Sequence, residues 1–122
     1  MRAFQFTKMQ GLGNDFVVLE GPQQLDPEEV VRLCVRRFGV GADGVLVVTP
    51  GEPIRMEYWN ADGSVAEMCG NGLRCVARYA YDRGWGRDRN FVIQTPVGGR
   101  GVRVLDDVER LQGIAYHACG VG

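Results

Sequence analysis

The order of its apolar segments limits the fold of this chain more than any other sequence feature. Apolar residues recur with helical spacing in two segments, one from Asp26 to the glycines at 39 and 41 and one from Gly70 to about Asp82. The first of these has the strongest helix signals, because Asp26 can cap the N-terminus and Pro27 suits the first helical position.

Strands are expected in the remaining apolar segments, because these are short or alternate between apolar and polar residues. The segments are 3–6, 16–19, 45–48, 54–59, 91–95, 102–105 and 111–116, with 97–100 as a further short segment interrupted by a Gly-Gly turn. Turns are expected at 11–14 and 60–64, at Gly98-Gly99 and at Asp106-Asp107. Two helices among about six or seven strands, in this irregular order, predict the α+β class, with the helices packed on a curved, mostly antiparallel sheet.

The composition is typical of a soluble globular protein. With 122 residues, 45% hydrophobic and 24% charged, the chain is expected to form one domain spanning 1–122. A net charge of -1 lacks the basic excess that binding to nucleic-acid phosphates requires, so no nucleic-acid partner is expected. Apolar runs are far shorter than the roughly 20 residues that cross a bilayer, and the start lacks a signal-peptide pattern. We therefore expect a cytoplasmic protein without a membrane partner.

Four cysteines occur in a chain for which no export signal is expected, so a disulfide framework is not the first interpretation. They also do not favour a metal site, because no C-x-x-C pair is present and His117 is the only histidine. Cys34 and Cys75 are expected to be buried packing residues. Cys69 and Cys119 are the other two.

The segment 39–44 (GVGADG) matches the G-x-G-x-x-G pattern of dinucleotide-binding proteins. That pattern works where a strand precedes the glycines and a helix follows to hold the pyrophosphate. Here a helix is expected before the glycines and a strand after them. We therefore expect these glycines to end a helix and turn the chain.

Cys69 precedes the glycine-rich start of the second expected helix. Unpaired backbone N–H groups and the positive end of the helix lower the pKa of a nearby thiol. The N–H groups of residues 70 to 72 could also hold a substrate carboxylate, since glycine allows an anion to approach the backbone closely. The alternative is a helix that merely begins after a cysteine.

Two kinds of cysteine chemistry can be compared. Nucleophilic catalysis of the papain type needs an activating histidine, and His117 has no evident orienting partner. A thiolate can instead remove a proton from carbon when hydrogen-bond donors stabilise the resulting carbanion through an adjacent carboxylate. Inversion of a stereocentre in this way needs two groups, one on each face.

Three blocks of the sequence resemble the diaminopimelate epimerase family. They are 8–16 (KMQGLGNDF), 37–44 (RFGVGADG) and 60–75, which contains NADGS and MCGNGLRC. The resemblance covers about residues 3 to 105 and corresponds to the N-terminal half of the family. It implies a single lobe of that fold, a curved, mostly antiparallel sheet packed on a central helix. It also implies a cofactor-independent isomerase of lysine and peptidoglycan biosynthesis that interconverts LL- and meso-diaminopimelate with a thiolate base and a thiol acid.

The same resemblance implies roles for individual residues. Cys69 would be one of the two catalytic cysteines, Asn14 and Asn60 would contact the amino-acid substrate, and Gly70 and Asn71 would hold its reacting carboxylate. Many family members carry a glutamine that touches substrate at the position of Gly44, and glycine cannot supply that contact.

Enzymes of this family have two similar lobes with the active site between them, whereas this chain corresponds to one. It is therefore expected to be a fragment or split product, a half that forms a homodimer, or a lobe kept as a non-catalytic binding or dimerisation domain. A C2 dimer of one lobe could bring two copies of Cys69 face to face. The tail containing Cys119 faintly resembles the second cysteine motif, or it is a disordered terminus. Racemisation of another amino acid, such as proline, is a further alternative.

Overall fold

The computed structural model describes residues 4–11, 13–37, 39–66, 70–86 and 89–104. In these residues seven strands form one sheet, with β5 paired to β4 and the others in the order β1-β2-β3-β4-β6-β7. The strands are β1 (Thr7–Gly11), β2 (Asn14–Glu20), β3 (Gly44–Thr49), β4 (Ile54–Asn60), β5 (Val65–Ala66), β6 (Asn90–Thr95) and β7 (Gly98–Arg103). The helices are α1 (Pro27–Cys34) and α2 (Gly70–Asp82).

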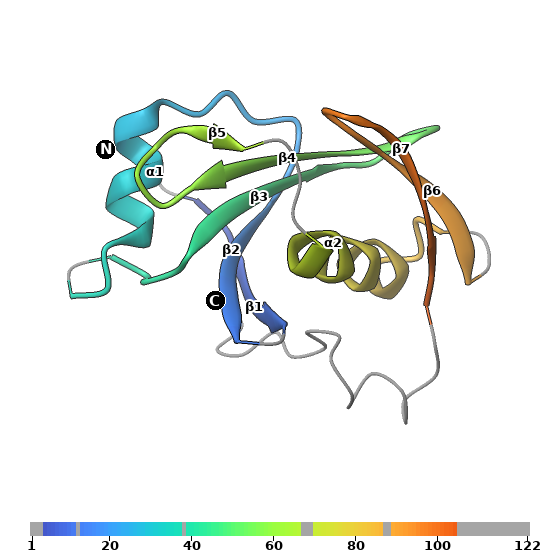
Figure 1. Ribbon diagram of the computed structural model, residues 1–122, viewed down its shortest axis with the longest axis horizontal. Helices are drawn as coiled ribbons and strands as arrows, with labels where there is room; N and C mark the ends of the chain where they lie inside the picture. The colour runs from blue at the N-terminus through green and yellow to red at the C-terminus, as the bar shows by residue number, and fades with distance from the viewer. Residues whose placement is uncertain (1–3, 12, 38, 67–69, 87–88, 105–122) are drawn as a thin grey trace.

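The sheet is mostly antiparallel, as predicted. The pairs β2–β3 and β4–β6 are parallel, and the other four are antiparallel. A parallel pair needs a crossover connection, which α1 supplies in the first case and α2 in the second. Figure 1 shows the sheet curling around α2, with α1 on the outer side. The α+β prediction, with helices packed on a curved sheet, is confirmed.

The two helices cover opposite faces of the sheet. The side chains of β2 point alternately to these two faces, so successive residues are buried against different helices. Phe16 and Val18 pack on the α2 side, together with Val76 and Ala80 of that helix. Val17 and Leu19 pack with Val30 of α1 on the other side. Burial on both faces explains why β2 is a continuous apolar run.

Helix α1 begins as predicted. The Asp26 carboxylate accepts a hydrogen bond from the backbone N–H of Glu28 at 3.1 Å, and the Glu29 carboxylate accepts one from the backbone N–H of Asp26 at 2.9 Å. This capping box satisfies N–H groups that the first turn leaves without helical partners.

The expectation that this helix reaches the glycines at 39 and 41 was wrong. Val35 is extended, and the loop after it folds back on the helix end: the N–H groups of Val40 and Gly41 both donate to the carbonyl of Leu33 at 3.0 Å. A side chain at Gly39 would collide with the backbone carbonyl of Arg32. The glycine is therefore needed to close the loop on the helix, as a cap and turn. A helix before this loop and a strand after it agree with the rejection of a dinucleotide fingerprint.

One strand and one turn were also predicted wrongly. The first strand is β1 rather than 3–6, because its register is set by the pairing of Gly11 with Asn14 across the glycine turn. The predicted Gly98-Gly99 turn is instead part of β7, and the turn lies at residues 96–97. Thr95 closes it: its hydroxyl donates to the carbonyl of Gly98 at 2.7 Å and accepts from the N–H of Val97 at 3.2 Å.

The predictions for 45–48, 54–59, 70–82 and 91–95 are confirmed by β3, β4, α2 and β6. Strand β7 merges the segments expected at 97–100 and 102–105. The strand at 111–116 and the Asp106-Asp107 turn lie outside the described residues. Neither α1 nor α2, in the part of the chain the structure covers, is long and apolar enough to span a membrane.

Candidate active site at one end of the sheet

The predicted substrate residues of three separate sequence blocks gather at one end of the sheet. Strand β2 begins at Asn14 and runs parallel to β3, with Phe16 paired to Gly44 at the start of β3. Strand β4 runs the opposite way and ends at Asn60, which pairs with Gly44. The topology therefore brings Asn14 and Asn60 to the same end of the sheet.

The start of α2 reaches this end of the sheet as well. The side-chain amide of Asn71, in the first turn, donates from Nδ2 to Oδ1 of Asn14 at 2.6 Å. Gly70 begins α2 and is exposed, and a Cβ added there would meet nothing within 4 Å. The structure thus brings Asn14 and Asn71 into contact beside Gly70. Cys69 and Cys119, the other cysteines considered for catalysis, lie outside the described residues.

Asn60 is held by its own turn. Its Nδ2 donates to the Ser64 hydroxyl at 3.0 Å, and that hydroxyl donates to the Asp62 carboxylate at 2.6 Å. The Asp62 carboxylate also accepts the backbone N–H of Ser64 at 2.9 Å, and these hydrogen bonds lower the pKa of Asp62. The acceptor-only carboxylate orients the hydroxyl, and the hydroxyl then orients the amide of Asn60.

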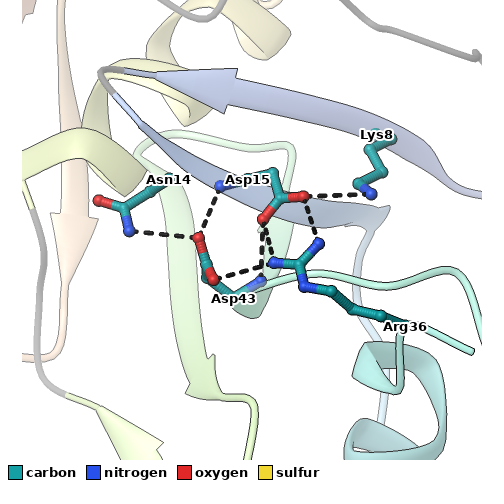
Figure 2. A network of polar contacts seen from close by, with 5 residues as sticks. All are labelled: Lys8, Asn14, Asp15, Arg36 and Asp43. Atoms are coloured by element: carbon teal, nitrogen blue, oxygen red, sulfur yellow. Dashed lines mark hydrogen bonds and ion pairs between the residues drawn. The ribbon is translucent and has the colours of Figure 1, made fainter.

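A network of two carboxylates and two cations lies next to Asn14 and contacts its side chain through Asp43 (Figure 2). Arg36 binds both oxygens of Asp15, at 2.9 and 3.0 Å, and Oδ1 of Asp43 at 3.1 Å. Lys8 forms an ion pair with Asp15 at 3.2 Å. The other oxygen of Asp43, Oδ2, accepts hydrogen bonds from Nδ2 of Asn14 at 3.3 Å and from the backbone N–H of Asp15 at 3.0 Å.

Sequence reasoning named none of these four charged residues as functional. A usable signal was present, because Asp15 follows Asn14 directly and Asp43 lies in the glycine block that precedes β3. Both aspartates border glycine turns that the topology brings together.

This network keeps the carboxylate of Asp15 charged. Hydrogen bonds from Arg36 are the largest cause and hold the pKa of Asp15 far below its usual range, with further lowering by Lys8 and Asp43. Partial burial acts in the opposite direction but is outweighed. The network is therefore intact at neutral pH.

The lowered pKa of Asp15 predicts a loss of stability in acid. A carboxyl whose folded-state pKa lies below its unfolded value stabilises the fold above the unfolded pKa, about 3.9, and loses this as the pH falls toward the folded value. We expect Asp15→Asn to lower the free energy of unfolding by about 1–2 kcal/mol at pH 7 and by less at pH 2.5, where the unfolded carboxyl is protonated but the folded one still keeps much of its charge. Urea unfolding at both pH values measures this. An equal effect at the two pH values would contradict the assignment.

Gly44 has no room for a side chain in this structure. A Cβ would lie 2.6 Å from the carbonyl oxygen of Trp59 and 2.7 Å from Cε1 of Tyr58. The Tyr58 ring therefore lies where a side chain at position 44 would begin, which agrees with leaving this contact out of the predicted site.

The two described cysteines are buried free thiols, as predicted. Burial is the main cause that raises the pKa of Cys34 to about 11, and the negative charges of Asp15 and Asp43 add to it. A thiol with this pKa stays protonated at neutral pH and is unsuited to act as a base. Within the described residues, no cluster of histidine, cysteine, aspartate or glutamate is suited to hold a metal ion.

Comparison with known proteins identifies the family. Residues 6–118 match the family model described as diaminopimelate epimerase. The diaminopimelate epimerase of Caldanaerobacter subterraneus subsp. tengcongensis is 52% identical over 97 residues, which are 77% of this chain and 35% of that protein. The diaminopimelate epimerase of Synechococcus sp. (strain JA-2-3B'a(2-13)) is 52% identical over 101 residues, with 76% and 35% covered. The chain thus spans about a third of the length of these relatives.

Solved structures share the fold. The phenazine biosynthesis protein of the PhzF family from Bacillus anthracis aligns with a TM-score of 0.67 at 20% identity, covering 88% of this chain and 38% of that one. Similarity at this identity supports the fold alone, whereas the family model and the curated relatives match the sequence itself. The chain therefore belongs to the diaminopimelate epimerase family.

Proposed function

We propose that this chain forms one lobe of a cofactor-independent epimerase that interconverts LL- and meso-diaminopimelate. The observation that carries the proposal is the contact between Asn14 and Asn71 at the N-terminus of α2. The relatives are named for this reaction, but the match covers only 35% of their length, so the activity is an inference for this chain.

The start of α2 is suited to hold the carboxylate next to the reacting carbon. The first turn of a helix presents backbone N–H groups that lack helical partners, and its positive end favours an anion. Asn14 and Asn71 each use one amide hydrogen in a hydrogen bond described above, and an amide nitrogen carries two. The second hydrogens are suitable donors to a substrate carboxylate, with Asn60 as a further contact from the same end of the sheet.

Cys69 directly precedes α2 in the sequence and is the proposed proton-exchanging group. A thiolate on one face removes the α-proton, and the electron pair left on carbon delocalises into the carboxylate held by the helix start. A thiol on the other face returns a proton to carbon, which inverts the centre and leaves the two cysteines with exchanged protonation states. No oxidant, metal or cofactor is needed for this balance.

The second thiol would come from a complementing second lobe or from a second copy of the chain. A two-lobe site fits the shorter length of this chain relative to its relatives. We propose a cytoplasmic role in the synthesis of lysine and peptidoglycan for the assembled enzyme.

A chimera tests this function. Residues 6–104 of this chain replace the corresponding segment of the Caldanaerobacter subterraneus enzyme, which supplies the remainder. We expect the chimera to convert LL- to meso-diaminopimelate. The unmodified relative, assayed under the same conditions, is the positive control. A folded chimera that leaves diaminopimelate unchanged, or that racemises proline instead, would overturn the proposal. The chain without the added segment shows whether a homodimer is sufficient.

A further inference from the structure

We propose that Asp43 is a positioning residue that sets the direction of the side-chain amides of both Asn14 and Asn71. This inference rests on the proposed function for its consequence, the binding of substrate. The orientation itself can be tested without any activity.

The first step is the chemistry of the Asp43 carboxylate. A carboxylate oxygen only accepts hydrogen bonds, so the atom of Asn14 that faces Oδ2 of Asp43 must be its amide nitrogen. The same oxygen accepts the backbone N–H of Asp15 at 3.0 Å. Two donors from adjacent residues therefore converge on one oxygen atom.

The second step is the hydrogen bond between Asn14 and Asn71. With Nδ2 of Asn14 toward Asp43, its Oδ1 points the other way and can only accept, which requires the facing atom of Asn71 to be a donor. That atom is Nδ2 of Asn71, at 2.6 Å. One carboxylate thus determines which end of each amide is presented, across residues that lie 57 positions apart in the sequence.

The third step is the fixing of Asp43 itself. Its Oδ1 accepts from Arg36 at 3.1 Å, and its backbone N–H donates to the backbone carbonyl of Asp15 at 2.8 Å. Arg36 is anchored in turn by both oxygens of Asp15. Because the side chain of Arg36 is 59% exposed, its ion pairs contribute little energy singly, and their main effect is to keep Asp43 in place.

The consequence is directional recognition. If either amide turned over, its carbonyl oxygen would face the substrate carboxylate and repel it. An unrestrained amide would populate both orientations and weaken binding.

Side-chain amide resonances of the ¹⁵N-labelled full chain test the orientation directly. In the native chain we expect one amide proton of Asn14 and one of Asn71 to exchange slowly with water, because each donates a hydrogen bond. The amide protons of a free asparagine exchange rapidly. Asp43→Ala removes the acceptor and is expected to make the amide protons of both residues exchange rapidly with water. Asp43→Asn keeps an oxygen for Asn14 and should preserve the slow exchange. Its NH₂ group would face two donors, Asn14 and the backbone of Asp15, if the amide turned over, and only the exposed Arg36 if it did not.

Lys8→Met is the matched control, because it removes one charge from the same network without touching Asp43. It should leave the slow exchange of both amides in place. Rapid exchange of both amide protons of Asn14 with water in the native chain would overturn the proposal without any variant. Unchanged slow exchange of Asn71 in Asp43→Ala, or an equal loss in Lys8→Met, would overturn it too.

In the chimera, Asp43→Ala is expected to raise KM for diaminopimelate about tenfold with a smaller change in kcat, because substrate binding is lost more than proton transfer. Asp43→Asn should stay within about threefold of the unmodified KM. A KM left unchanged by Asp43→Ala would overturn the positioning role. If the chimera itself is inactive, the proposed function fails, and the amide resonances still decide the orientation.

Discussion

Replacing Cys69 with serine is expected to lower kcat of the chimera for epimerisation by about a thousandfold. General acid and base groups contribute about 10²–10⁴ in rate, and a serine hydroxyl is far too weak an acid to supply an anionic base at neutral pH. Conversion of LL- to meso-diaminopimelate, followed by chiral chromatography, measures the loss. The fold should be unaffected, because the change is one atom.

Cys34→Ala is the matched control for this prediction. Cys34 is buried and has a raised pKa, so its removal should leave kcat within about threefold of the unmodified chimera. If Cys69→Ser retained full activity, or Cys34→Ala lost as much, Cys69 would not be the proton-exchanging group.

The largest effect on stability is expected at Phe16. Its side chain is completely buried between β2 and α2, and its ring meets that of Tyr58 edge to face with centroids 5.8 Å apart. Replacing a buried phenylalanine with alanine costs about 3–5 kcal/mol, because apolar contacts are lost and a cavity remains. Domains of this size are stable by only about 5–15 kcal/mol, so much of the stability would disappear. Urea unfolding of the full chain measures it.

Val92→Ala is the control, because Val92 is 52% exposed on β6. It should change the free energy of unfolding by no more than about 0.5 kcal/mol. A loss below about 1 kcal/mol for Phe16→Ala would show that the face between the sheet and α2 is not the main core.

Signals within single sequence segments were sufficient to predict most of the helices and strands. The capping residues around Asp26 and the apolar stripe of α2 depend on neighbours in the sequence, so their prediction succeeded. The end of α1 depends on a loop that returns to its carbonyls, and the position of β1 depends on pairing across a turn. Neither is visible in the periodicity of one segment.

The candidate site likewise has residues that the sequence predicted and residues that it did not. The resemblance to the family implied Asn14, Asn60, Gly70 and Asn71, and the structure places Asn14 and Asn71 in contact. The link through Asp43 and Arg36 was missed, because it joins blocks that meet only when β2 and β3 pair in parallel. A charged residue beside a glycine turn has many possible roles until its partner is known.

Epimerisation in D₂O is the most direct test of proton transfer at the α-carbon. The chimera converts LL-diaminopimelate, and ¹H NMR with mass spectrometry follows the first meso product that forms. Our account predicts one deuterium at the inverted carbon of each product molecule, because the returning proton comes from a thiol in exchange with solvent. Meso product that retains the original α-proton would contradict it.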